Sequence, residues 1–277
     1  MGALFRVSLK EMVRRRTLAI TLGMTVLYLV AYTVILRYAA GAVNQTANPL
    51  MRAVLVPQIA TAGLYFAGQI LAFFAIASTM GALAGERETG VMQVIATAPV
   101  QRHEIVLGKL FGYWTVLAAY AAVLCVGVFL LLRALTGFAL SNPWPTTAVF
   151  TLQPLLLSAL TMLGSAVLPT IPNAVVMFSL YAISLLGGVL EQIAGFTRSA
   201  TLSAIGIVTS LLIPADSLYR KSVSLALAAR DNPLAGLVMI GPFGAQSPPS
   251  VWMLAYVGFY LVACITLTVF LFARRDL

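Results

Sequence analysis

Six long apolar stretches, each bounded by charged or helix-breaking residues, dominate the pattern of hydrophobic and polar positions along the chain. A helix that crosses the hydrocarbon core of a bilayer needs about 20 consecutive, mostly apolar residues. Each stretch meets this requirement. We therefore predict six membrane-spanning helices, at about 17–36, 57–84, 105–132, 146–168, 173–195 and 251–272.

Prolines set two of these boundaries. The charge-free stretch 134–190 is too long for one span, and Pro169 and Pro172 lie inside it. Proline removes a backbone donor and interrupts a helix. We expect one span to end near residue 168 and the next to begin near Asn173, and we expect the second span to begin near Pro57.

The segment 199–213 is apolar but has only 15 residues before Pro214. This length favours a re-entrant or interfacial helix over a seventh span. The segment belongs to a long connection, 198–249, which six spans place outside the cell. That connection either caps the exit of a pathway, binds an outside partner or packs as an interfacial loop.

Composition supports a membrane protein. The 277 residues are 61% hydrophobic and 9% charged, with a mean hydropathy of +0.98, whereas soluble domains carry about 25% charged residues. We therefore expect one all-α transmembrane domain over residues 1–277. The net charge of +9 is clustered near segment ends, which indicates contact with anionic membrane lipids and no nucleic-acid partner.

Positive charge also predicts orientation. Five Lys and Arg residues precede the first span and two Arg residues follow the last. Because basic loops stay in the cytoplasm, we expect both termini there, in a multi-pass protein of a bacterial or archaeal inner membrane with no cleavable signal.

Residues 3–15 form an amphipathic pattern. Phe5, Leu9, Met12 and Val13 share one face at helical spacing, opposite a basic face. Two interpretations stay open for residues 1–16: a helix that lies in the membrane interface, or a charged anchor ahead of the first span.

The connection 85–104 holds the only histidine and three of the eight acidic residues. Gly90 permits a turn after a charged helix end, and Val91, Val94 and Ile95 then follow at helical spacing until Pro99. We predict a short helix across the cytoplasmic face; an ordinary charged loop is the alternative.

The pattern Gly-Glu-Arg-Glu-Thr-Gly, seven residues, then Ala-Pro-Val-Gln-Arg-His-Glu-Ile-Val-Leu-Gly-Lys resembles the first cytoplasmic loop of ABC-2 transporter permeases. The Pro-x-Asp segment at 214–216 is similar to one branch, which includes the permease of the nitrous-oxide-reductase maturation system. The tail Arg-Arg-Asp-Leu is also common in the family.

The resemblance implies a type V exporter-like transmembrane domain with an N-terminal elbow helix and a coupling helix that docks on a separate ATPase. Two ATPase copies would hold ATP and Mg²⁺, and two permease copies, most simply a homodimer, would form the pathway. The implied docking residues are Glu86, Arg87, Glu88, Gly90, Val91, Val94, Ile95, Pro99, Arg102, His103 and Glu104. A second, smaller contact is implied at Pro169, Thr170, Pro172 and Asn173.

The residues themselves offer little for catalysis or cofactor binding. There is no Gly-x-x-x-x-Gly-Lys-[Ser/Thr] phosphate loop, and His103 has no second metal ligand nearby. The chain is therefore expected to be no enzyme on its own and to hold no cofactor or metal.

The spans contain almost no ionisable residues, which favours an apolar, amphipathic or lipid-like substrate. Glu191 is the one candidate, and its simplest interpretation is a solvated helix end. Asp216 and Asp231 are expected to form local ion pairs with the flanking Arg220, Lys221 and Arg230. A single-chain secondary transporter and an intramembrane lipid-modifying enzyme are the alternative functions.

Overall fold

The computed structural model describes residues 2–14, 16–45, 49–90, 101–197, 199–227, 243–245 and 249–274. These residues form helices, turns and loops, with no strand among them. The helices, in chain order, are α1 (Gly2–Arg14), α2 (Arg16–Gln45), α3 (Pro49–Thr79), α4 (Ala84–Glu88), α6 (Arg102–Thr136), α7 (Pro143–Val167), α8 (Thr170–Thr197), α9 (Ala200–Leu212), α10 (Ala215–Ala226) and α12 (Trp252–Arg274).

Six of these helices, α2, α3, α6, α7, α8 and α12, are long and apolar enough to cross a membrane. The prediction of an all-α polytopic membrane protein is therefore confirmed. Large apolar side chains such as Leu27 on α2 and Phe259 on α12 are more than 70% exposed. Lipid tails are the surroundings that suit such faces.

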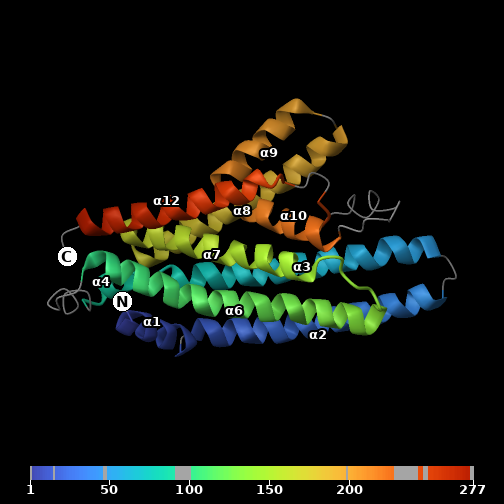
Figure 1. Ribbon diagram of the computed structural model, residues 1–277, viewed down its shortest axis with the longest axis horizontal. Helices are drawn as coiled ribbons and strands as arrows, with labels where there is room; N and C mark the ends of the chain where they lie inside the picture. The colour runs from blue at the N-terminus through green and yellow to red at the C-terminus, as the bar shows by residue number, and fades with distance from the viewer. Residues whose placement is uncertain are drawn as a thin grey trace.

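The long helices lie side by side along the long axis of the molecule (Figure 1). The N-terminus, the C-terminus and α4 share one end of this bundle. Helix α7 is the central element, because it packs against α3, α6, α8, α10 and α12. The buried core of the bundle is therefore built around α7. A displacement of the end of α7 would change its packing against most of the other helices.

Two proline positions behave differently. Helix α7 ends at Val167 and α8 begins at Thr170, so the break falls where the prolines predicted it. Pro172 lies in the first turn of α8, where its missing N–H has no helical partner to lose. Helix α3 begins at Pro49 and continues through Pro57, and its membrane-spanning candidate segment begins at Val54, so a span that begins near Pro57 stays a prediction.

The N-terminal helix α1 packs against α6. Ser8 and Met12 on its inner face are buried, and Lys10 is exposed. Val13, which we predicted on the apolar face, is 53% exposed. The packed stripe is rotated around the helix relative to the prediction: it follows positions 5, 8, 9 and 12, and position 13 lies beyond its edge.

Helices α9 and α10 form a bent pair. The axis turns by 102° at Ile213 and Pro214, which gives the geometry of a broken span or a re-entrant loop. Helix α9 packs back along α8, and the α8–α9 pair projects from the side of the bundle (Figure 1). Helix α10 lies against α7 and α8, so the segment 199–226 is a packed part of the fold.

Candidate functional site

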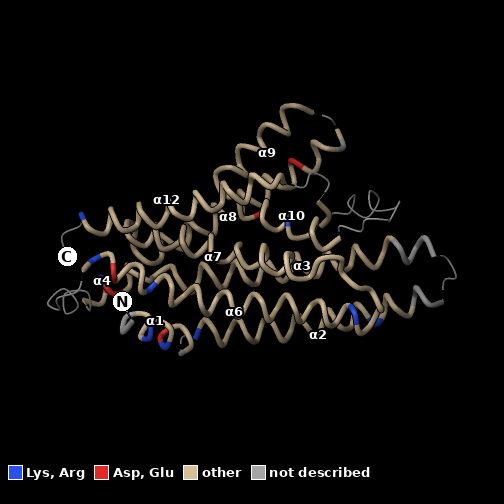
Figure 2. Tube along the Cα trace, viewed as in Figure 1, with Lys and Arg blue, Asp and Glu red and all other residues tan. Residues whose placement is uncertain are grey.

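The candidate site lies at the end of the bundle that holds both termini. Helix α4 joins α3 to the segment before α6 there, next to the turn between α7 and α8. Charged residues are sparse along the middle of the long helices and more frequent toward this end (Figure 2). Polar contacts in this region can therefore connect elements that are otherwise joined only by apolar packing.

The turn between α3 and α4 is held by side chains from α7 and α8. The hydroxyl oxygen of Ser165 accepts hydrogen bonds from the backbone N–H groups of Leu83 (3.0 Å) and Ala84 (2.9 Å). The Asn173 amide donates to the carbonyl oxygens of Met80 (2.8 Å) and Thr161 (3.0 Å). A helix start leaves backbone donors without partners, and Ser165 supplies the missing acceptor from a neighbouring span.

Glu88 binds the beginning of α8. Its carboxylate accepts hydrogen bonds from the backbone N–H of Thr170 (2.8 Å) and from the Thr170 hydroxyl (3.0 Å). These two donors stabilise the charged carboxylate, and so the pKa of Glu88 lies below its ordinary value. A carboxylate at a helix N-terminus is also favoured by the helix dipole.

Arg87 binds the end of α7 on the other side of the same turn. Its guanidinium donates to the carbonyl oxygens of Leu168 (3.3 Å) and Ala166 (3.5 Å). The last carbonyls of a helix have no partner within the helix. Arg87 and Glu88, two successive residues of α4, thus bind the end of α7 and the start of α8.

Glu86 forms an ion pair with Lys109 of α6, and the Lys109 ammonium also donates to the Ala82 carbonyl oxygen (2.7 Å). The Lys109 side chain is only 4% exposed. A buried ammonium needs a counter-charge and acceptors; Glu86 of α4 supplies the charge, and Ala82, in the turn before α4, supplies a carbonyl acceptor. We call these contacts the α4 clasp: Glu86 with Lys109, Arg87 and Glu88 with the α7–α8 turn, and Ser165 with the start of α4.

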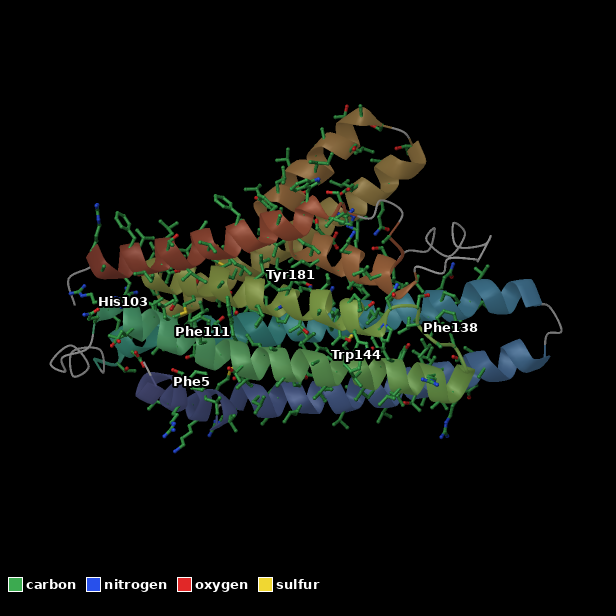
Figure 3. All side chains as sticks on the ribbon, in the orientation of Figure 1. Phe5, His103, Phe111, Phe138, Trp144 and Tyr181 are labelled. Atoms are coloured by element: carbon green, nitrogen blue, oxygen red, sulfur yellow. The ribbon has the colours of Figure 1, made fainter. Side chains whose placement is uncertain are left out.

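The first residues of α6 add a further link. Arg102 donates to the carbonyl oxygens of Phe272 (3.2 Å) and Ala273 (3.2 Å) at the end of α12. His103 is exposed at this end of the bundle (Figure 3), and Glu104 is partly exposed nearby. Among the described residues, no group of three His, Cys, Asp or Glu side chains could hold a metal ion.

The structure thus brings together two regions that we predicted as separate contacts with an ATPase. Residues 86–88 and 169–173 meet in the α4 clasp, and Gly90 ends α4 with a φ of 73°, in agreement with the predicted turn. Pro169 and Pro172 are exposed beside the clasp. The predicted docking residues Val91, Val94, Ile95 and Pro99 lie outside the described residues.

We predicted that Glu86, Glu88 and Arg102 pair with side chains of an ATPase. Each of them has partners within this chain, and their role toward an ATPase stays a prediction. Ser165 was not among the predicted site residues. Small polar residues in apolar spans usually serve helix–helix contact, and nothing in the sequence indicates that the partner of this serine is the start of α4.

A second polar cluster joins α8, α9 and α10. The Arg220 guanidinium pairs with Glu191 (2.6 Å) and Asp216 (2.9 Å), and the Ser210 hydroxyl donates to Glu191 (3.3 Å). The local pair of Asp216 with Arg220 is confirmed, and Asp231 lies outside the described residues. The interpretation of Glu191 as a solvated helix end is wrong, because the folded-back α9 and α10 cover it and leave its side chain 15% exposed.

The fold and these contacts define a multi-pass helical membrane protein whose connecting segments are fastened at one end. A family model described as ABC-2 family transporter protein matches residues 5–277, and the chain therefore belongs to that family. No curated protein matches it. The chain is thus a membrane protein of an ABC transporter, in a family whose permeases generally pair with ABC ATPase subunits.

Proposed function

We propose that this chain is the permease subunit of an ABC exporter and that a separate ATPase docks on the end that carries the α4 clasp. The single observation that supports this most is the set of bonds from α4 to α6, α7 and α8. A loop that only obeyed the charge rules of membrane topology would not need such bonds. A loop that transmits a partner's movement to the membrane-spanning helices would need such bonds.

The proposed mechanism is rigid-body transmission. When two ATP-bound ATPases close, they displace the segment 85–104, which contains the proposed coupling helix. Residues 86–88 pass this displacement to Lys109 on α6 and to the α7–α8 turn. Arg102 extends it to the end of α12. A ligand shifts a conformational equilibrium only through contacts that differ between the two states. In this chain, the contacts of the α4 clasp would be the ones that differ.

The remaining parts of the assembly follow from this arrangement. ATP and Mg²⁺ would bind to the two ATPase copies, and two permease chains, most simply a homodimer, would enclose the pathway. The end with the α4 clasp would face the cytoplasm together with both termini, in a bacterial or archaeal inner membrane. The amphipathic α1, with its exposed basic residues, would rest on the headgroups of that leaflet.

We further propose an apolar, amphipathic or lipid-like substrate. A cavity of about 470 Å³ lies between α2 and α3 and is lined mainly by apolar and aromatic side chains, including Tyr28, Tyr32 and Phe66. The tyrosine hydroxyls donate to the carbonyl oxygens of Gly63 (2.6 Å) and Ile59 (3.4 Å). Their polar atoms are thus already engaged, which suits an apolar ligand better than an ion.

A charge change in the α4 clasp tests the proposal. The full-length chain is purified with its ATPase, reconstituted in liposomes, and assayed for ATP hydrolysis with and without candidate amphipathic substrates. We expect Glu88→Lys to lose most of the substrate-stimulated hydrolysis, because the carboxylate no longer binds the start of α8.

The matched control is Thr89→Lys, which adds a cation one residue away. The Thr89 hydroxyl bonds only to carbonyls of its own short helix, so stimulation should persist. Full stimulation in Glu88→Lys would contradict the transmission role of the α4 clasp. Stimulation by small inorganic ions alone would contradict the proposed substrate class.

A further inference from the structure

A second cavity lies near the end of the bundle opposite the termini. The connection 137–142 folds back between the end of α6 and the start of α7 and, together with these helices, lines a half-open cavity of about 290 Å³. Phe138 and Trp144 come from this connection and from the first turn of α7 (Figure 3). Most of the lining is apolar, and Arg133 is the one charged side chain in it.

Arg133 is exposed in the last turn of α6, and its guanidinium has no ion pair or hydrogen bond with the described part of the chain. This differs from Arg102, Lys109 and Arg220, which all bind carbonyls or carboxylates. The other polar side-chain groups of the lining lie on α7: the Thr147 hydroxyl, which donates to the Pro143 carbonyl (2.9 Å), and the indole N–H of Trp144. The cavity therefore offers a free guanidinium above apolar walls.

The depth of this cavity in the membrane follows from helix geometry. Arg133 comes 24 residues after Lys109 on α6, which corresponds to about 36 Å along the helix axis. The hydrocarbon core of a bilayer is about 30 Å thick. With Lys109 near one boundary, Arg133 lies at the headgroup level of the leaflet opposite the termini. Trp144 is 80% exposed beside it, and tryptophan prefers this interfacial level.

We propose that this cavity is a binding site for an anionic phospholipid of that leaflet, with the phosphate on Arg133 and an acyl chain along the apolar wall formed by Phe129, Leu130 and Phe138. An arginine fork matches phosphate geometry and can donate two parallel hydrogen bonds. The proposal rests on the membrane-embedded fold and is independent of ATPase docking.

The bound lipid would stabilise a specific contact of the outer segment. The Ser141 N–H donates to the Ala226 carbonyl (3.2 Å), and the Asn142 amide donates to the Leu225 carbonyl (3.4 Å). The α6–α7 connection therefore both lines the cavity and binds the end of α10. Occupancy of the cavity should thus order the α6–α7 connection and α10 together.

The experiment measures lipid retention by native mass spectrometry on the full-length protein in detergent. The probes are phosphatidylglycerol and phosphatidylcholine with identical acyl chains. We expect the wild type to retain phosphatidylglycerol preferentially and Arg133→Gln to weaken its retention about ten-fold, because a hydrogen-bonded charge is removed. Arg133→Lys keeps the charge and should retain an intermediate affinity.

Arg37→Gln is the matched control. Arg37 lies 21 residues after the start of α2, about 32 Å along its axis, is exposed, lines neither of the two cavities and has no partner in the described residues. Its removal should leave phosphatidylglycerol retention unchanged. Equal losses in Arg37→Gln and Arg133→Gln would overturn the proposal, since retention would then reflect general surface charge.

Two further measurements distinguish lipid binding at this cavity from the binding of a soluble phosphate and from a loss of retention caused by misfolding. Glycerol 3-phosphate in excess should not displace phosphatidylglycerol; displacement would show a site for soluble phosphates and overturn the lipid assignment. In a variant with Trp114→Phe and Trp252→Phe, the remaining Trp144 should be quenched by phosphatidylglycerol with brominated acyl chains, and less so after Arg133→Gln. Quenching that is unchanged by Arg133→Gln would also overturn it.

Discussion

Single polar groups join the helices of this protein at a few points, and Ser165 is the simplest of them. It is fully buried and accepts hydrogen bonds from two backbone N–H groups at the start of α4. Ser165→Ala would leave both donors buried without a partner. We predict that it lowers the free energy of unfolding by about 2 kcal/mol, measured by denaturation in detergent micelles.

Ser179→Ala is the corresponding control. Ser179 is exposed on α8, and its removal should change the free energy of unfolding by less than about 0.5 kcal/mol. If the two alanine variants were equally stable, the Ser165 hydroxyl would not hold the α3–α4 turn.

Gly188 is a second residue on which the packing depends. A side chain at this position would overlap the carboxylate of Asp216, so α8 and α10 approach closely only because Gly188 has none. Gly188→Ala should reduce the free energy of unfolding by about 1–3 kcal/mol, as overpacking does. Gly258 on α12 has nothing within 4 Å of an added Cβ.

Gly258→Ala should therefore be neutral or slightly stabilising, because alanine favours the helix by about 1 kcal/mol over glycine. Thermal unfolding of the two variants side by side makes the comparison. A Gly188→Ala protein as stable as Gly258→Ala would mean that the α8–α10 approach is looser than the structure shows.

Among the elements, the bent pair α9–α10 depends most on one ionic cluster. Arg220 is 1% exposed and neutralises carboxylates from two different helices. Arg220→Gln would leave Glu191 and Asp216 buried without their cation. Breaking a buried ion pair in this way costs about 3–5 kcal/mol, and we expect the α9–α10 segment to become accessible to protease under conditions where the wild type resists.

Lys221→Gln removes the neighbouring cation, which donates to the Pro249 carbonyl (2.9 Å) and belongs to no ion pair in the described residues. It should leave the protease resistance of α9 and α10 largely intact. Equal sensitivity of the two variants would show that the segment responds to net charge and not to this cluster.

The elements themselves were largely predictable from the sequence. Six apolar stretches of spanning length gave six spans, because a bilayer requires that length and excludes charge. Helix α3 extends on the N-terminal side of Pro57, because an internal proline costs one hydrogen bond and a long apolar helix can tolerate that loss. Glu191 was misread because its partner Arg220 is 29 residues away in the sequence, beyond any local pattern.

The candidate site was predictable only in part. Charged residues in a connection between spans indicated a functional loop, and the prolines indicated the α7–α8 turn. That the two meet depends on tertiary packing, since Glu88 and Thr170 are separated by 82 positions. No helical or strand periodicity carries information over such a distance.

The whole molecule is a helical bundle whose two ends carry different features. The end with both termini carries the α4 clasp, which connects α4 to α6, α7 and α8. The opposite end carries the cavity at Arg133 and the contacts that hold α10. Because α7 packs against α4 and against α3, α6, α8, α10 and α12, a displacement at the α4 clasp has a continuous, close-packed route toward the opposite end.

The central claim, that a separate ATPase drives this chain through its 85–104 connection, is tested most directly by copurification of ATP hydrolysis with the tagged full-length protein from its native membrane. The wild type should bring an ATPase with it. Val94→Asp with Ile95→Asp should lose that ATPase, because two charges would replace apolar side chains that are predicted to dock on it.

The matched control, Ala200→Asp with Thr201→Asp, places the same charges in the exposed first turn of α9, where a helix start favours them. This variant should retain the ATPase and its activity. Loss of hydrolysis from the loop variant alone is the predicted result. A wild type that purifies without ATP hydrolysis, or a loop variant that keeps it in full, would contradict the account.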